Sequence, residues 1–149
     1  MIKVQREDFD LAAETAALTR GETGIGGVVS FTGLVRDASD GAKVTAMTLE
    51  HYPGMTEKKL AEIEDEARRR WPLQACLIIH RYGRLQPGER IMAVVTASAH
   101  RQAAFEAAGF LVDWLKTKAP FWKLESDGAD DRWVAARDSD DAAAERWGK

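Results

Sequence analysis

The sequence predicts one α+β domain with a mixed or antiparallel sheet and packed helices. With 149 residues, of which 45% are hydrophobic, the chain can build one sizeable core but not two ordinary ones. Strand-like and helix-like segments both occur, without the regular strand-helix alternation of a doubly wound sheet. We therefore expect residues 1–149 to form a single domain, whose residues from about 126 to 149 are a polar, partly flexible C-terminal segment.

The first two elements are a short strand and a short helix. Ile2 to Gln5 is predicted to be a strand. Asp10 is a good N-cap for an alanine-rich helix from Leu11 to about Thr19, because its carboxylate can accept a hydrogen bond from a free backbone amide. Gly21 then ends this helix.

Two further strands are predicted after a glycine cluster. The cluster Gly21 to Gly27 precedes a strand instead of linking a strand to a helix, so it fits no dinucleotide fingerprint and no P-loop. Residues 26–35 and 44 to about 52 have strand-like composition. The polar loop 37–41 between them suggests a hairpin with a mobile tip near residues 37–42.

The second half begins with an amphipathic helix. It follows Pro53-Gly54 and ends at Pro72, and spacings of three and four residues place one apolar face against the core. This face comprises Leu60, Ile63, Ala67 and Trp71.

Another hairpin and a long helix are predicted next. Residues 75–82 and 90–97 are strands, and Pro87-Gly88 between them fits a type II turn. The helix runs from about Ala99 to Thr117 and has an alanine-rich stripe. This stripe permits close packing against another helix or against a second subunit.

The junction after this helix is the most informative stretch of the chain. Pro120 disfavours a helical conformation at Ala119, so Lys116 should lie at a helix end and Lys123 at the start of an extended segment. Two amines beside the Phe121-Trp122 pair could share one pocket, and desolvation there would favour acid, base or nucleophilic chemistry. The alternative is two solvated lysines that flank core aromatics. In the polar tail beyond, Trp133, Val134 and Trp147 are expected to provide anchors.

Charge and cysteine content exclude several classes of protein. The net charge of −3 and pI of about 5.7 argue against broad nucleic-acid or membrane binding. Cys76 lies in an apolar run and is the single cysteine, so we expect neither an internal disulfide nor a thiolate metal site. No signal peptide or membrane-spanning stretch is recognisable, which predicts a cytoplasmic protein.

Other polar residues are weaker candidates when each is taken alone. His100-Arg101 at a helix start could hold an anion, with Ser98 as the cap, or could simply be solvated. Arg36 follows a strand and is either functional or a surface charge. His51 beside Glu50 fits a structural turn at least as well as a catalytic pair, and His80 is most simply a packed or interface histidine. These histidines predict no metal site and no cofactor.

Four separated motifs together resemble the large, catalytic subunit of molybdopterin synthase. The order and spacing of the motifs match that family from about residue 2 to Trp147. The motifs are Phe31-Thr32-Gly33-Leu34-Val35-Arg36, Leu49-Glu50-His51-Tyr52-Pro53-Gly54-Met55, Ser98-Ala99-His100-Arg101, and Lys116 to Lys123.

The resemblance implies a fold, partners and a reaction. The family has an α/β hammerhead fold and dimerises, and each end of the dimer binds a small ubiquitin-like carrier of the MoaD type, giving a heterotetramer. The carrier's C-terminal Gly-Gly thiocarboxylate supplies sulfur to cyclic pyranopterin monophosphate, which forms the dithiolene of molybdopterin. The chain is thus expected to be a sulfurtransferase of molybdenum cofactor biosynthesis.

The same resemblance assigns roles to residues. Lys116 and Lys123 correspond to the catalytic lysines, and both also belong to the implied substrate-binding set. The other members of this set are Leu34, Val35, Arg36, His100, Arg101, Leu124 and Glu125. The chain departs from the family pattern after Lys123, where Leu124-Glu125 stands in place of a further basic residue.

Two other functions are compatible with these residues. One is a noncatalytic receptor for a ubiquitin-like tail, in which the lysine-aromatic segment only docks an extended peptide. The other is a stand-alone esterase or lyase that uses Lys116 as a nucleophile and needs no carrier.

Overall fold

The structure is a computed structural model that describes residues 1–39, 41–134 and 138–148. Over these residues it contains two four-stranded sheets, a two-stranded ribbon and four helices, which confirms the predicted α+β class. No helix in this part of the chain is long and apolar enough to cross a membrane. The elements are β1 (Ile2–Gln5), α1 (Leu11–Thr19), β2 (Gly27–Leu34), β3 (Ala38–Ser39), β4 (Ala42–Lys43), β5 (Ala46–His51), α2 (Met55–Arg70), β6 (Leu73–Arg81), β7 (Gly83–Leu85), β8 (Arg90–Ser98), α3 (Arg101–Lys118), β9 (Phe121–Ser126), β10 (Asp131–Val134) and α4 (Asp138–Glu145).

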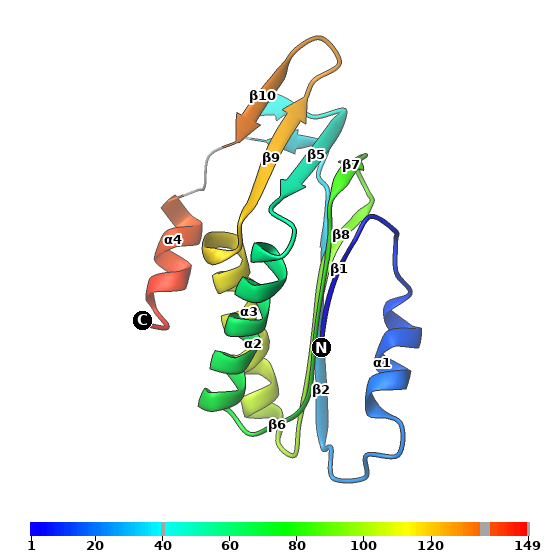
Figure 1. The fold of residues 1–149 in the computed structure, drawn as a ribbon, viewed down its shortest axis with the longest axis vertical. Helices are drawn as coiled ribbons and strands as arrows, with labels where there is room; N and C mark the ends of the chain where they lie inside the picture. Colours follow the sequence, from blue (N-terminus) through cyan, green and yellow to red (C-terminus); the bar gives the residue numbers. More distant parts are fainter. Residues whose placement is uncertain (40, 135–137, 149) are drawn as a thin grey trace.

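The first sheet has the strand order β1-β6-β8-β2, and helices cover both of its faces. β1 runs parallel to β6, whereas β6, β8 and β2 are antiparallel to one another, so the predicted β6–β8 pairing is confirmed. The predicted turn is present as well, because Glu89 N–H donates to the Gln86 carbonyl and Gly88 has a φ of 90°. Figure 1 shows α1 on one side of this sheet and α2 and α3 on the other.

The second sheet has the order β10-β9-β5-β7 and corrects one prediction. The expected hairpin between residues 26–35 and 44–52 does not form, because β2 pairs with β8 whereas β5 pairs with β7 and β9. The β3–β4 ribbon carries the chain from the first sheet to the second. β5 is largely buried in its own sheet, and β2 is a half-exposed edge strand, so the two belong to different environments. The expected mobile tip includes residue 40, which lies outside the described residues.

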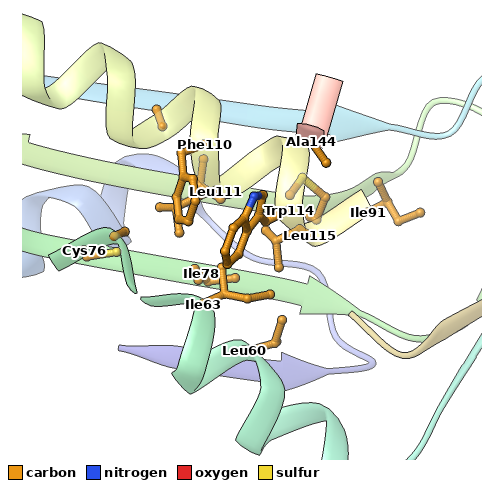
Figure 2. Close-up of a cluster of buried hydrophobic side chains, with 14 of the residues drawn as sticks. Leu60, Ile63, Cys76, Ile78, Ile91, Phe110, Leu111, Trp114, Leu115 and Ala144 are labelled. Atoms are coloured by element: carbon orange, nitrogen blue, oxygen red, sulfur yellow. The ribbon is translucent and has the colours of Figure 1, made fainter. Parts of the chain in front are cut away.

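The main core lies between the first sheet and the helices α2 and α3. Figure 2 shows Leu60 and Ile63 of α2, Ile78 of β6, and Phe110 and Trp114 of α3 in this layer. The α2 face predicted from residue spacing is therefore confirmed for Leu60 and Ile63, both of which are buried. Trp71 is the C-cap of α2 and not part of the helix, but its ring still packs against Phe110 at a centroid distance of 5.3 Å.

The opposite face of the same sheet forms a smaller core under α1. Leu77 and Ile79 face α1, while Cys76 and Ile78 face α2 and α3, as the two-residue period of a strand requires. Because both faces are covered, β6 is an almost continuous apolar run instead of an alternating one. As predicted, Asp10 caps α1, where its Oδ1 accepts a hydrogen bond from Ala13 N–H at 3.1 Å.

The C-terminal segment contains regular secondary structure. Its described residues include β10 and α4, although residues 135–137 and 149 lie outside the description. Trp147 Nε1 donates to Asp113 Oδ2 at 2.6 Å, which fixes this end of the chain on α3. Trp133, in contrast, is 63% exposed and is not a core anchor.

Truncating a core side chain of α2 should destabilise the fold strongly. We expect Leu60→Ala to lower the free energy of unfolding by about 2–5 kcal/mol, since Leu60 has no exposed surface and its removal leaves a cavity. Met55→Ala is the matched control on the same helix, because Met55 is 61% exposed and its loss should change stability by less than about 0.5 kcal/mol. Urea unfolding at one fixed protein concentration measures both, and equal effects would contradict this account of the core.

Candidate active site

The junction between α3 and β9 has the predicted geometry. α3 ends at Lys118, and its C-cap Ala119 has extended dihedrals (φ −80°, ψ 137°), as a residue before proline should. The chain then continues directly as β9. Lys116 therefore lies in the last helical turn, and Lys123 is the third residue of the strand.

Beside this junction lies a cavity of about 560 Å³ between the two sheets. Its wall is formed by the end of β2 and the residues after it, the end of α3, β9, and one or two residues each from other elements. Lys116, Lys123 and Arg36 all line it, although they come from distant parts of the sequence. The structure thus brings together these three cations with three other predicted site residues, namely Leu34, Val35 and Glu125.

The two faces of β9 divide its side chains between the cavity and the outer surface. Phe121, Lys123 and Glu125 line the cavity, because alternate residues of a strand point the same way. Trp122 packs instead edge-on against Tyr52 at 4.5 Å, so only one member of the aromatic pair walls the cavity. Leu124 does not line the cavity either and pairs with Trp133 across the β9–β10 ladder.

The described wall of the cavity carries more positive than negative groups. Two carboxylates, those of Glu125 and Asp140, face the three cations Arg36, Lys116 and Lys123. Glu125 is buried, and its Oε1 lies 3.8 Å from Arg132 NH2 on the neighbouring strand. An excess of cations in a partly enclosed space favours an anionic ligand, since low dielectric strengthens the attraction.

His100 and Arg101 lie at the other end of α3 and do not line this cavity. His100 is the exposed N-cap, without a side-chain capping bond. Lys116 lies 16 residues further along, which is roughly 24 Å of helix at 1.5 Å per residue. Ser98 is not the cap that the sequence suggested, because it is buried and its Oγ donates to the Pro72 carbonyl at 2.8 Å.

The glycine cluster before β2 has a packing role at the start of α3. A Cβ on Gly26 would lie 2.1 Å from the Ala99 carbonyl oxygen, and a Cβ on Gly27 would lie 3.4 Å from Arg101 Cα. Glycine therefore allows the first residues of β2 to lie against the first residues of α3. β2 consequently runs from the Arg101 end of α3 to the cavity.

His51 has the structural role that the sequence left open. Its Nδ1 lies 3.3 Å from Thr56 Oγ1, and its ring packs 4.3 Å from the Tyr82 ring. Glu50 is exposed, and neither Glu50 nor His51 lines the cavity. The two residues do not form a catalytic pair there.

His80 lines the cavity, although sequence reasoning treated it as a packed or interface residue. It is buried in β6 and stacks on Phe121 with a centroid distance of 3.7 Å and an interplanar angle of 14°. Burial, helped by the positive charges of Lys123 and Lys116, lowers the pKa of His80 to about 4. A histidine inside an apolar strand needs a polar partner, and that signal could have identified it.

Cys76 is not a reactive group of this site. It is buried, and burial raises the pKa of its thiol to about 12, so the nucleophilic thiolate is not populated near neutral pH. Within the described ranges, no three histidine, cysteine, aspartate or glutamate side chains are grouped as metal ligands would be. The ionisable side chains in the described wall of the cavity are those of Arg36, Lys116, Lys123, Glu125, Asp140 and His80.

Comparison with known proteins identifies what this arrangement resembles. Residues 4–118 match the model of a family described as MoaE protein. A molybdopterin synthase catalytic subunit of Mesorhizobium japonicum is 57% identical over 148 residues, which is 98% of this chain and 92% of the relative. The solved structure of a molybdopterin cofactor biosynthesis protein E from Burkholderia multivorans has a TM-score of 0.84 and 50% identity, and covers 100% of this chain and 97% of that chain.

A more distant structure shares the fold. It is a protein-protein complex of subunits 1 and 2 of the molybdopterin-converting factor from Helicobacter pylori, with a TM-score of 0.75 and 17% identity. The match covers 91% of this chain and 91% of that chain.

The buried neutral His80 should make stability depend on pH in a specific window. Its pKa falls from the ordinary 6.5 to about 4 on folding, so between these values the unfolded chain binds a proton that the folded chain does not. The contribution of neutral His80 to the free energy of unfolding is fully present above pH 6.5. It is lost as the pH falls, by an amount on the order of 3 kcal/mol at pH 4. His80→Phe, which keeps a ring against Phe121, should show a flatter profile in urea unfolding from pH 7 to 4.5.

The comparison of these two profiles has an internal control. Arg90 and Arg69 hold the pKa values of Asp8 and Glu66 at about 2, so these carboxylates lose their contributions mainly below pH 4.5 in both proteins. Parallel profiles of the wild type and His80→Phe between pH 6.5 and 4.5 would contradict the buried neutral state of His80.

Proposed function

Because the chain belongs to the MoaE protein family, we infer that it is the catalytic subunit of a molybdopterin synthase and that its cavity holds the reaction. The proposed reaction moves sulfur from the C-terminal thiocarboxylate of a small ubiquitin-like carrier to cyclic pyranopterin monophosphate, which becomes a dithiolene. The observation that carries this proposal is the convergence of Lys116, Lys123 and Arg36 on one cavity.

These cations suit the charges that develop in such a reaction. Opening the cyclic phosphate and displacing sulfur from the acyl carrier both place negative charge on oxygen, and preorganised cations lower the energy of such states. Arg36 can bind a phosphate with its forked guanidinium, and either lysine can move a proton when it is neutral. Lys116 and Lys123 are thus proposed as catalytic residues, and Arg36 as a substrate-binding residue.

The carrier is proposed to insert its C-terminal tail into the same cavity. A Gly-Gly tail has no side chains, so it can enter between β9 and the end of α3 in an extended form. The Helicobacter pylori relative was solved as a complex of two subunits, which supports a two-subunit enzyme here. The reaction is proposed to take place in the cytoplasm.

A second copy of the chain is proposed to supply His100 and Arg101. Within one chain α3 separates these residues from Lys116, so a substrate-binding role requires another molecule. β2 is an edge strand of the first sheet, and Val28, Phe31 and Leu34 on it are exposed. An exposed edge with apolar side chains favours pairing with another strand.

The direction of β2 is compatible with a site that is shared between two chains. One end of β2 lies beside Arg101, and the other leads into Arg36 at the cavity. In a two-fold dimer each β2 would pair antiparallel with its copy, so the Arg101 end of one chain would lie beside the Arg36 end of the other. Each dimer would then contain two sites built from both chains.

Reconstitution with defined lysine variants tests the proposed activity. The purified chain, mixed with thiocarboxylated carrier and cyclic pyranopterin monophosphate, should consume carrier sulfur and form a dithiolene. Lys116→Ala and Lys123→Ala should each lower the rate of dithiolene formation by about 10²–10³-fold, the usual cost of removing one charge-stabilising group. Carrier affinity, measured by calorimetry, should change little.

Lys118→Ala is the matched control for the lysine variants. Lys118 is in the same helical turn, but its amine lies 4.7 Å from the centre of the Trp114 ring and the residue does not line the cavity. Its removal should leave the rate unchanged. Carrier binding without any dithiolene in the wild type would instead indicate a noncatalytic receptor.

Mixing two inactive variants tests the shared site. Lys116→Ala and Arg101→Ala should each be impaired alone, but a mixed dimer has one cavity in which both residues are intact. Random exchange makes half of the dimers mixed, so about one quarter of wild-type activity should return. Lys116→Ala mixed with Lys123→Ala should show no recovery, because both lesions lie on the same side of the cavity. No recovery in the first mixture would contradict a site shared between two chains.

A further inference from the structure

We propose that His80 is a further substrate-contacting residue of this cavity, whose Nε2 accepts a hydrogen bond from an N–H or O–H group of the substrate. The inference rests on the proposed function for the identity of the substrate. The site would then contain a neutral acceptor that hydrogen-bonds to the heterocycle, in addition to the cations that bind the anionic group.

The His80 ring is held in one orientation by its surroundings. β6 lies between β1 and β8, where His80 pairs with Val4 on one side and Met92 on the other. Only 8% of the residue is exposed, and the ring lies nearly parallel to the Phe121 ring. A ring packed in this way presents its nitrogens in fixed directions.

The hydrogen bond of one ring nitrogen fixes the tautomer. His80 Nδ1 lies 2.9 Å from the carbonyl oxygen of Arg81. A carbonyl oxygen can only accept, so Nδ1 must carry the hydrogen and donate it. In the neutral ring Nε2 then has no hydrogen and offers a lone pair.

The second ring nitrogen, Nε2, has no partner among the residues that the structure describes, and it is accessible to solvent. Among the described residues, the only side-chain nitrogen or oxygen that is both sealed and without a partner is Trp114 Nε1. His80 makes its hydrogen bond through Nδ1, and no described group pairs with Nε2. Since Nε2 is unpaired but still accessible to solvent, we infer that it faces the cavity that His80 lines.

The protonation state makes this nitrogen an acceptor and not a general base. Burial is the largest cause that lowers the His80 pKa to about 4. The bond to the Arg81 carbonyl opposes this lowering, and electrostatic interactions with Lys123, Lys116 and His51 add to it. The imidazole is therefore neutral near pH 7. It is also too weakly basic to take a proton from a lysine ammonium, so its use lies in accepting a hydrogen bond.

Among the described residues that line the cavity, His80 is the only histidine. Arg36, Lys116 and Lys123 are donors that suit an anionic group, and Glu125 and Asp140 are the carboxylates in the described wall. A pterin monophosphate carries an anionic phosphate and also ring N–H groups. When such a molecule binds, its ring N–H groups need hydrogen-bond acceptors in the protein. A ring N–H group that is buried without an acceptor would weaken the complex.

A matched pair of substitutions tests the acceptor directly. His80→Asn keeps a donor close to the position of Nδ1 and has nothing at Nε2, whereas His80→Gln places an amide oxygen near the position of Nε2. Both variants lose the ring stacked on Phe121, so any effect of lost packing is common to them, and thermal unfolding checks that their stabilities match. In reconstituted turnover, we expect KM for the pterin to rise about 5- to 150-fold in His80→Asn, with at least a fivefold smaller rise in His80→Gln and an unchanged carrier affinity.

The outcomes separate this inference from the proposed function. If the wild type forms dithiolene and the two variants have equal KM values, His80 does not contact the substrate, while the sulfurtransferase function stands. A KM difference that Gln rescues supports the contact, because a purely structural role would affect both variants alike.

If the variants fold poorly or the wild type proves inactive, the contact between His80 Nε2 and the pterin can be tested on the unaltered protein. In ¹⁵N-labelled wild type, the Nε2 resonance of His80 should have the shift of an unprotonated imidazole nitrogen. Addition of cyclic pyranopterin monophosphate should move it toward the hydrogen-bonded range. Sulfate, an anion without donors, should leave it in place. An Nε2 shift that does not respond to the pterin at saturation would overturn the inference.

Discussion

The burial of the β6–β8 pair from both sides is the constraint on which the rest of the structure depends. Leu77, Ile78 and Ile79 have no exposed surface, because α1 covers one face of the sheet and α2 and α3 cover the other. A one-residue slip of β6 would exchange the side chains of its two faces and mismatch both cores, so the register is strongly fixed. The same packing fixes α3 and β2, and the ends of these two elements form part of the cavity wall.

The cavity exists because two sheets with different roles meet at one place. The first sheet is covered by helices on both faces, whereas β9 of the second sheet has one face toward the cavity and one toward the surface. Pro120 links the two by turning the chain from helix to strand without a loop. Two lysines seven residues apart thereby reach one space from a helix and a strand.

In the proposed enzyme, different groups around the cavity bind different parts of the substrate. Cations from β9, from the end of α3 and from the segment after β2 suit phosphate and developing oxyanions, and His80 supplies a neutral acceptor from the buried sheet. Because Nδ1 is bonded to the Arg81 carbonyl, Nε2 can accept a hydrogen bond from a ligand donor, as proposed above. The proposed role of His100 and Arg101 requires a second chain, because the length of α3 keeps both residues away from the cavity of their own chain.

The sequence by itself determined most of the local structure and the protein family. Spacing and capping signals located α1, α2 and α3, Pro120 marked the helix-to-strand junction, and the motifs around Lys116 and Lys123 indicated the family. These signals are local, because capping bonds, proline geometry and helical periodicity each involve residues within a few positions of one another.

Only the tertiary structure decided which strands pair and which side chains meet. It separated β2 from β5, turned Leu124 away from the cavity and placed His100 far from Lys116. It also turned His80 from an apparent packing residue into part of the site wall. The physical reason is that strand pairing and cavity formation depend on the burial of surfaces distant in sequence, and no local pattern records which buried surface a given strand will meet.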